Sequence, residues 1–291
     1  MAIKIALAGN PNCGKTTMFN ALTGANQYVG NWPGVTVEKK EGKCKENKDV
    51  IVTDLPGIYS LSPYTLEEVV SRDYLLKEKP EAIINLVDAT NIERNLYLTT
   101  QLLELGIPVV IALNMADLLE KNKISIDTKA LEKELGCKVV KTSALKGTGI
   151  HEVVKEAVTA AKKESIVSGK IKFSKDTEAA VSEMEGQLPS SVLKEQKKWY
   201  AIKLLERDAK VLEQLKLTAS VQNQVEKIAA RLEEKLDDDT ESIITNERYE
   251  AITHVVEKCV KKPKEKLSTS DKIDQIVTNR ILGLPIFLGV M

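Results

Sequence analysis

The sequence predicts an α/β domain with a doubly wound, mostly parallel sheet, followed by a small all-helical domain. Over residues 1 to about 165, strand patterns alternate with helical patterns, as in a parallel sheet that is covered by helices on both faces. From about residue 176 to 262 strand patterns vanish and apolar residues recur at helical spacing. The chain of 291 residues is long enough for both domains.

Each element of the α/β domain follows from a local pattern. Residues 82–87 are a continuous apolar run, as expected of a strand that is buried on both faces. The other expected strands are residues 3–8, 50–53, 109–113 and 138–140, and the expected helices are residues 17–22, 66–78, 96–105, 128–135 and 150–163. Residues 35–41 are expected to pair antiparallel with the strand before Asp54.

The second domain shows helical patterns throughout. Apolar residues recur on one helix face at Val221, Val225, Ile228 and Leu232. Ser191 and Thr240 resemble helix starts, and residues 237–239 are expected to be a solvated acidic cluster at such a start. Trp199 and Tyr200 are expected to pack in the core of this domain, and a partner surface is the alternative.

A glycine-rich loop joins the first strand to the first helix. It consists of Gly9, Asn10, Pro11, Asn12, Cys13, Gly14, Lys15 and Thr16. Between a strand and a helix, such a loop can direct backbone N–H groups and the positive end of the helix dipole at phosphate oxygens. Lys15 would reach the terminal phosphates, the Thr16 hydroxyl would hold Mg²⁺, and Thr17 belongs to the same binding segment. The alternative for the glycines is an ordinary turn.

A carboxylate and a glycine N–H after the strand at 50–53 complete a phosphate and metal site. Asp54 stands at the end of that strand, where a carboxylate can bind Mg²⁺ through water. Gly57 can give its N–H to a γ-phosphate. A plain turn from Asp to Gly is the alternative for this segment.

Two further segments point to guanine rather than adenine. Asn114, Met115 and Asp117 follow the apolar strand at 109–113, and the carboxylate can accept both N–H donors on the N1 and N2 edge of guanine. Ser143 and Ala144 follow the strand at 138–140, and their N–H groups could meet guanine O6. Met115 replaces the Lys that is usual in Ras-like proteins, so packing of a Lys stem over the base is lost while the carboxylate remains.

The segment between the phosphate loop and Asp54 has the composition of a switch loop. Glycines and a proline surround Trp32, and Gly34 and Thr36 are candidate nucleotide-site residues. Thr36 would supply a second hydroxyl to Mg²⁺ and release it when the γ-phosphate leaves. A β-branched strand residue is the alternative interpretation of Thr36.

The sequence lacks the glutamine that orients the attacking water in Ras-like enzymes. Ile58 stands at that position, so hydrolysis must use another group or be slow. Asn at the place of Asn12 marks GTPases that bind K⁺ beside the phosphates, and backbone carbonyls of Gly30 and Trp32 are candidate co-ligands. A hydrogen bond that braces the loop is the alternative role of Asn12.

These segments resemble the cytosolic amino-terminal part of the ferrous iron transport protein B family. The resemblance is carried by residues 9–20, 30–38, 54–61, 114–117 and 271–291, and it covers the chain from end to end. It implies a Ras-like GTP-binding domain at 1–165, a helical domain at 166–262, and a linker with the start of a truncated first membrane helix at 263–291. It also implies slow, K⁺-stimulated GTP hydrolysis at catalytic residues Asn12, Lys15, Thr36 and Gly57.

The resemblance further implies where the protein works and with what. GTP or GDP, Mg²⁺ and K⁺ would be its ligands, and a membrane-embedded Fe²⁺ permease would follow in the same longer chain. The fragment would lie at the cytoplasmic face of the inner membrane. A homo-oligomer and small Feo accessory proteins are further expected partners.

Composition limits the alternatives. Basic and acidic residues balance at 42 each, so no electrostatic footprint for nucleic acid is visible. The four cysteines lie apart without metal-ligand spacing, which favours reduced thiols, with redox control as the second interpretation of Cys13. No signal peptide is expected, because the first residues lead directly into a strand.

Two alternatives to a module of an iron transporter stay open. The second hypothesis is a soluble K⁺-dependent GTPase of ribosome or tRNA maturation, and the third is a nucleotide-binding scaffold without useful turnover.

Overall fold

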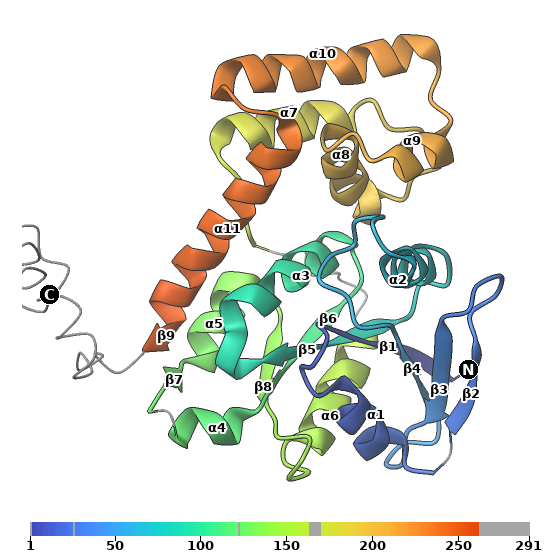
Figure 1. The fold of residues 1–291 in the computed structure, drawn as a ribbon, viewed down its shortest axis with the longest axis vertical. Helices are drawn as coiled ribbons and strands as arrows, with labels where there is room; N and C mark the ends of the chain where they lie inside the picture. The colour runs from blue at the N-terminus through green and yellow to red at the C-terminus, as the bar shows by residue number, and fades with distance from the viewer. Residues whose placement is uncertain (1, 26, 122, 163–169, 262–291) are drawn as a thin grey trace, which may run out of the picture.

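The computed structural model describes residues 2–25, 27–121, 123–162 and 170–261 (Figure 1). The expected domain boundary near 165 and the expected membrane segment at 263–291 lie outside the described residues. In the described part, no helix combines the length and the apolar character that crossing a membrane requires.

A seven-stranded sheet forms the amino-terminal domain, in the order β2-β3-β4-β1-β5-β6-β8. The strands are β1 (Ile3–Gly9), β2 (Gln27–Asn31), β3 (Glu38–Lys43), β4 (Val50–Asp54), β5 (Ala82–Asp88), β6 (Val109–Asn114) and β8 (Lys138–Lys141). Strand β1 pairs in parallel with β4 and β5, and only the β2–β3 and β3–β4 pairs are antiparallel. The carboxyl ends of β1, β4, β5 and β6 therefore meet at one edge, where a doubly wound sheet binds its ligands.

Helices cover both faces of this sheet, as the apolar strands require. The helices are α1 (Lys15–Thr23), α2 (Leu66–Lys77), α3 (Ile92–Glu104), α4 (Ala116–Lys121), α5 (Thr128–Leu135) and α6 (Ile150–Ala161), with a 3₁₀ turn η1 (Ala89–Asn91) before α3. Alternate residues of β1 enter different cores, because side chains alternate along a strand. Ile5 and Leu7 pack with α1 and α6, whereas Ala6 and Ala8 face the core of α2, α3 and α5.

The carboxy-terminal part of the described chain, residues 170–261, is mainly helical. It contains α7 (Lys175–Glu185), η2 (Lys194–Gln196), α8 (Lys197–Leu205), α9 (Ala209–Leu215), α10 (Ala219–Leu236) and α11 (Thr240–Cys259). Trp199 and Tyr200 are buried in its core with their rings edge to face, as expected. The buried residues of this domain form one continuous hydrophobic cluster with those around α2, α3 and α5. The two domains therefore share a core.

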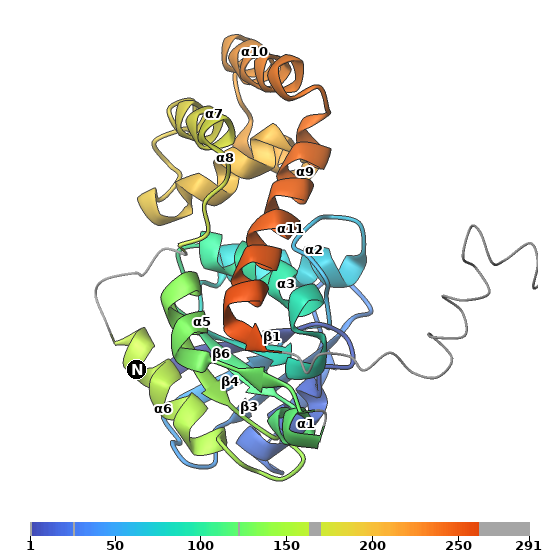
Figure 2. The ribbon, with the colours of Figure 1, turned by 90° about the vertical axis from the view of Figure 1, so that its left-hand side faces the viewer.

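Both ends of the helical domain are fixed to the sheet domain. Helix α11 runs back along α3 and α5 and ends in β9 (Val260–Lys261), which pairs with β7 (Ser125–Ile126) (Figure 2). At the other end, the Lys170 N–H donates to the Leu135 carbonyl at 3.4 Å. The chain thus enters and leaves the helical domain on the α5 side of the sheet domain.

Several expected elements need correction at their ends. The expected strand at 35–41 begins later, at Glu38, because residues 32–37 form a turn with the Trp32 N–H donating to the Val37 carbonyl. Helix α3 begins earlier, at Ile92, because the Asp88 carboxylate organises the preceding turn through Thr90 and Asn91. The helix start expected at Ser191 is wrong, since α8 begins only at Lys197 after η2.

A buried ion pair lies where α11 crosses α3. The guanidinium of Arg248 contacts both carboxylate oxygens of Glu104, with N–O distances of 2.6 and 2.8 Å. The Arg248 side chain is fully buried and that of Glu104 is 10% exposed. A third bond runs from Arg248 to the Thr100 hydroxyl at 3.1 Å.

We predict that Glu104→Ala lowers the free energy of unfolding by about 3 kcal/mol, because it leaves a buried guanidinium without its counter-charge. Urea denaturation followed by circular dichroism measures this change. Glu93→Ala is the matched control, since Glu93 lies on the same helix and, within the described residues, its side chain accepts a single exposed hydrogen bond, from Thr253. Equal stability of the two variants would contradict the prediction.

Candidate nucleotide-binding site

The phosphate loop has the backbone that its sequence predicts. It lies between the end of β1 at Gly9 and the start of α1 at Lys15. Asn12 and Gly14 have positive φ angles of 64° and 89°, values that favour Asn and Gly. A Cβ atom at Gly14 would lie 2.6 Å from the Asn114 amide nitrogen, so only glycine fits there.

Lys15 and Asp54 form an ion pair beside the loop. The Lys15 Nζ lies 2.6 Å from an Asp54 carboxylate oxygen, and the two side chains are 12% and 9% exposed. Burial raises the pKa of Asp54, and the charge of Lys15 opposes that rise. An ammonium suited to phosphate oxygens and a carboxylate suited to Mg²⁺ thus lie within one hydrogen bond of each other.

The segment after Asp54 packs directly on the phosphate loop. The Leu55 N–H donates to the Leu7 carbonyl at 3.0 Å, and the Ile58 N–H donates to the Gly9 carbonyl at 3.3 Å. A Cβ atom at Gly57 would lie 3.3 Å from the Pro11 Cα. The Ile58 side chain is 2% exposed, so it belongs to the core and lacks any polar atom to hold a water.

Asn114 joins the phosphate loop to the segment expected to contact the base. Its amide nitrogen donates to the Cys13 carbonyl at 2.8 Å, and its amide oxygen accepts from the Ala144 N–H at 2.9 Å. Asn114 is 3% exposed, so these bonds form away from water. Asn114 at the end of β6 therefore fixes the distance between the phosphate loop and the segment around Ala144.

The residues expected to read the base lie together on the other side of Asn114. Met115 has a positive φ of 59°, and the Ala116 N–H donates to the Thr142 carbonyl at 3.1 Å. The Lys146 ammonium lies 3.2 Å from an Asp117 oxygen. Hydrogen bonds from Lys146 and Ser143 lower the pKa of Asp117, so its carboxylate stays ionised. Sequence reasoning missed Lys146, which is one lysine among many.

The switch loop, residues 30–36, packs against helix α2 and does not extend freely into solvent. The Trp32 side chain is 7% exposed, and its ring packs edge-on against Tyr74 at 5.2 Å between centroids. Gly30 lies within β2, opposite Lys39. The Trp32 carbonyl accepts from the Val35 N–H at 3.2 Å, Gly34 has a φ of 77°, and Thr36 is exposed. Among the described residues, no hydrogen bond joins Thr36 to the phosphate loop.

The side chain of Cys13 fills space beneath the loop. It is 1% exposed, and a Cβ atom at Gly9 would lie 2.8 Å from its sulfur. Burial raises the pKa of this thiol to about 11, which keeps it protonated and unreactive at neutral pH. Packing is therefore its role in this geometry.

Two family descriptions match the chain. Residues 3–157 match the family described as "Ferrous iron transport protein B", and residues 173–261 match "FeoB cytosolic helical domain". The chain belongs to the ferrous iron transport protein B family. Its amino-terminal domain is a GTP-binding P-loop fold of this family, and the Ras-like fold class and the helical second domain are confirmed.

Curated relatives and solved structures agree with this assignment. The Fe(2+) transporters FeoB of Shigella flexneri and Salmonella typhimurium are each 40% identical to the chain over 99% of its length, which spans 37% of theirs. A point mutant of S. thermophilus NFeoB bound to mGDP is 48% identical with a TM-score of 0.86, and covers 89% of this chain and 100% of its own. S. thermophilus NFeoB bound to GDP.AlF4⁻ and K⁺ is 49% identical with a TM-score of 0.81, and covers 88% of this chain and 99% of its own.

We predict that Asn114→Ala weakens GDP binding on the order of tenfold or more, since it removes two buried hydrogen bonds and leaves their partners unpaired. Isothermal titration calorimetry with GDP measures the change. Asn246→Ala is the control, because Asn246 is an exposed amide on α11. GDP affinity equal to that of the control would show that the separation of the two segments is held by other contacts.

Proposed function

We propose that the chain is the nucleotide-dependent cytosolic module of a longer Fe²⁺ transporter. It binds GTP, hydrolyses it slowly with K⁺ stimulation, and regulates or drives uptake through a membrane permease in the same longer chain. The observation that carries the proposal is the Asn114 side chain, which ties the phosphate loop to the base-reading segment. We propose Fe²⁺ as the transported ion because of the family membership and the relatives named Fe(2+) transporter, and the cytoplasmic face of the membrane as the location is part of the same proposal.

Each phosphate and metal residue has a role that its chemistry supports. Lys15 and the loop N–H groups would hold the phosphates, with Gly57 donating to the γ-phosphate from its place against Pro11. Thr16, Thr36 and, through water, Asp54 offer the hard oxygen ligands that Mg²⁺ prefers. Before Thr36 can take part, the loop that Trp32 holds on α2 must rearrange.

We assign base recognition to Asp117, Ser143 and Ala144, which lie on the side of Asn114 away from the phosphate loop. Asp117 is ionised and would accept hydrogen bonds from N1 and N2 of guanine. Lys146, which is now paired with Asp117, would then have to share this carboxylate with the base or move away from it. The N–H groups of Ser143 and Ala144 lie beside it, and the Ala144 N–H already bonds to Asn114. The Ser143 N–H is also in use, because it donates to the Thr148 carbonyl at 3.1 Å, so either N–H would have to share its hydrogen with guanine O6.

Hydrolysis must proceed without a side chain at position 58 to orient water, because Ile58 is buried. Bound K⁺ would supply positive charge beside the phosphates, held by the exposed Asn12 side chain and by the Gly30 and Trp32 carbonyls. With the Trp32 carbonyl already accepting from Val35, that ligand set requires the same rearrangement of the switch loop. Slow turnover is the consequence that we expect.

The two other hypotheses have less support. A soluble GTPase of ribosome or tRNA maturation calls for a basic surface, whereas the chain has equal numbers of basic and acidic residues. Measuring GTP hydrolysis distinguishes the proposed GTPase from the third hypothesis, a nucleotide-binding scaffold without useful turnover. Homo-oligomers and small Feo accessory proteins stay proposed partners of the longer chain.

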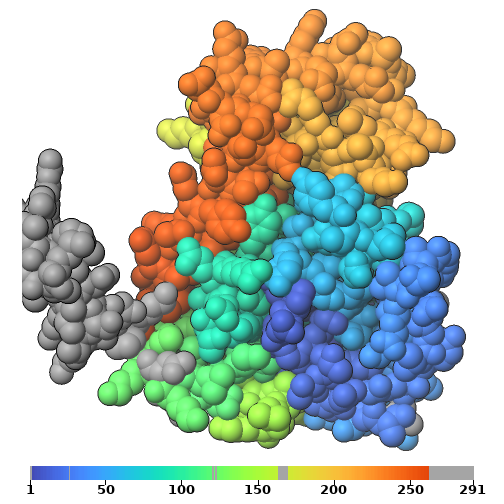
Figure 3. Space-filling model, in the orientation of Figure 1, coloured from blue at the N-terminus to red at the C-terminus, as the bar shows by residue number. Residues whose placement is uncertain are grey.

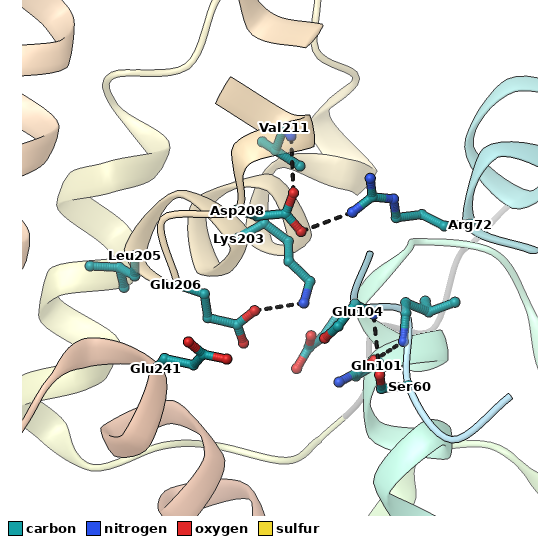
Figure 4. A network of polar contacts seen from close by, with 12 residues as sticks. Ser60, Arg72, Gln101, Glu104, Lys203, Leu205, Glu206, Asp208, Val211 and Glu241 are labelled. Atoms are coloured by element: carbon teal, nitrogen blue, oxygen red, sulfur yellow. Dashed lines mark hydrogen bonds and ion pairs between the residues drawn. The ribbon is translucent and has the colours of Figure 1, made fainter. Parts of the chain in front are cut away.

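A polar network gives the nucleotide site a route to the helical domain (Figure 4). Arg72 on α2 donates to Asp208 at 2.8 Å, and the two side chains are 4% and 3% exposed. Asp208 also caps α9, accepting from the N–H groups of Lys210 and Val211. Near the start of the same helix, the hydroxyl of Ser60, six residues after Asp54, donates to the Glu68 carboxylate at 3.1 Å. A movement of the segment after Asp54 would therefore reach α9 through polar contacts at the two ends of this part of α2.

We predict that Asn12→Ala abolishes K⁺ stimulation while leaving GDP affinity within a few-fold of the parent. Phosphate release is measured in K⁺ and in Na⁺, with Asn246→Ala as the control for an exposed amide. Stimulation that persists in Asn12→Ala would contradict the cation assignment. No hydrolysis of GTP by the parent chain in either salt would favour the scaffold.

We predict that Arg72→Ala removes the effect of the nucleotide on the helical domain. Hydrogen exchange over residues 197–215 is compared between GDP and a non-hydrolysable GTP analogue, and the difference should disappear. Arg72→Lys, which keeps the charge, should retain part of it, and Lys77→Ala, at an exposed ion pair on the same helix, should retain all of it. An unchanged difference in Arg72→Ala would exclude this route.

A further inference from the structure

The two outer strands of the sheet differ in how their free edges are protected. At one edge, β8 has Lys138 and Lys141 at its exposed positions. The Glu132 carboxylate accepts from the Val139 N–H at 3.1 Å and so occupies a backbone donor of that strand. Charged side chains and blocked backbone groups are the usual means of preventing a sheet edge from pairing with another chain.

The other edge, β2, has none of this protection. Its sequence from Gln27 to Asn31 contains no charged residue and no proline. Tyr28 is 69% exposed and Val29 is 52% exposed, although both are strand-forming residues. Within the described part of the chain, no side chain hydrogen-bonds to the backbone of β2. The strand lies at the outside of the fold, at the right of Figures 1 and 3.

Strand β2 is also held in place, so little ordering is needed before it pairs. The Gln27 amide donates to the Asn20 side chain and to the Gly24 carbonyl, both at 2.8 Å, which fixes the start of β2 to the end of α1. The Tyr28 ring lies over Gly30, since a Cβ atom there would be 3.0 Å from the Tyr28 hydroxyl. An aromatic ring over a strand glycine gives a flat, apolar surface.

We propose that β2 is a homodimerisation edge that pairs antiparallel with β2 of a second copy of this chain, centred on Val29. In that register Tyr28 is paired with Gly30 of the other copy, and Val29 is paired with Val29. Because each Tyr28 ring already lies over Gly30 of its own strand, the two rings lie side by side across the pair. No like charges oppose each other along the pair, and the chain has no net charge to repel a second copy. The arrangement is isologous, because the same strand serves both copies, and it closes at a dimer.

The interface has a consequence for the nucleotide site, because β2 leads directly into the switch loop at Trp32. One strand pair buries little surface, so the dimer is weak and reversible in solution. Attachment of two copies to a membrane would favour it through high effective concentration. The inference does not depend on the proposed role in iron uptake.

The test begins with sedimentation velocity of the 291-residue chain across the micromolar range. We expect the parent to shift toward dimer with concentration, and Val29→Lys to stay monomeric, because it places two like charges opposite each other. Leu193→Lys is the control, since Leu193 is 46% exposed but lies outside the sheet, and it should dimerise like the parent. A parent that stays monomeric at every concentration overturns the proposal and leaves an extended segment of another protein as the partner of β2.

Disulfide trapping tests the register. Residues directly opposite in an antiparallel pair have Cβ atoms about 5 Å apart, so Val29→Cys should form a covalent dimer rapidly under mild oxidation. Asn31→Cys should not, because its counterpart lies four residues along the paired strand. The native cysteines are buried or partly buried, so the parent chain serves as the control for disulfides that do not involve the introduced cysteine. Equal trapping of both variants would indicate random collision and overturn the proposed pairing, while GDP titration of each variant checks separately that the nucleotide site is intact.

Discussion

The nucleotide site depends on the carboxamide of Asn114. A primary amide offers both a donor and an acceptor, and here each is used on a different segment of the chain. The donor bonds to the Cys13 carbonyl of the phosphate loop, and the acceptor bonds to the Ala144 N–H of the segment proposed to contact the base. An ionised carboxylate has no donor, and a hydroxyl has a single oxygen for both bonds, whereas the two bonds of Asn114 run from two separate atoms. One buried side chain therefore fixes how far the phosphate loop lies from the segment proposed to read the base.

Around this site, the sheet domain and the helical domain behave as parts of one packed body. Their apolar side chains form a continuous core, and two buried ion pairs, Arg72–Asp208 and Arg248–Glu104, lie within it. Ion pairs of this kind add little net stability, because desolvation of the charges offsets their attraction. They do specify the position of α11 and α9 over α3 and α2, since any other docking would leave charges unpaired. These pairs thus favour one docking of the helical domain on the shared apolar core.

Local patterns in the sequence predicted the parts of this structure that are determined locally. The phosphate loop, the strand ends that carry Asp54 and Asn114, and the helical domain all have such signals, and the structure brings Gly57 against Pro11 as a parallel sheet requires. Sequence alone could not predict β2, whose five residues include Gly and Asn. It also could not predict the burial of Trp32 on Tyr74, or the pairing of Lys146 with Asp117, because these contacts depend on distant segments. The shared core was missed for the same reason, as composition separates domains but does not show how they pack.

The helical domain is attached at both of its ends. Lys170 is bonded to Leu135 where the chain enters, and β9 is paired with β7 where it leaves. Between these two attachments, α11 packs along α3, and Arg72 of α2 is paired with Asp208, so the helical domain is held at several further points. A response of this domain to the nucleotide is therefore expected as small shifts of packed helices rather than as the rotation of a free body.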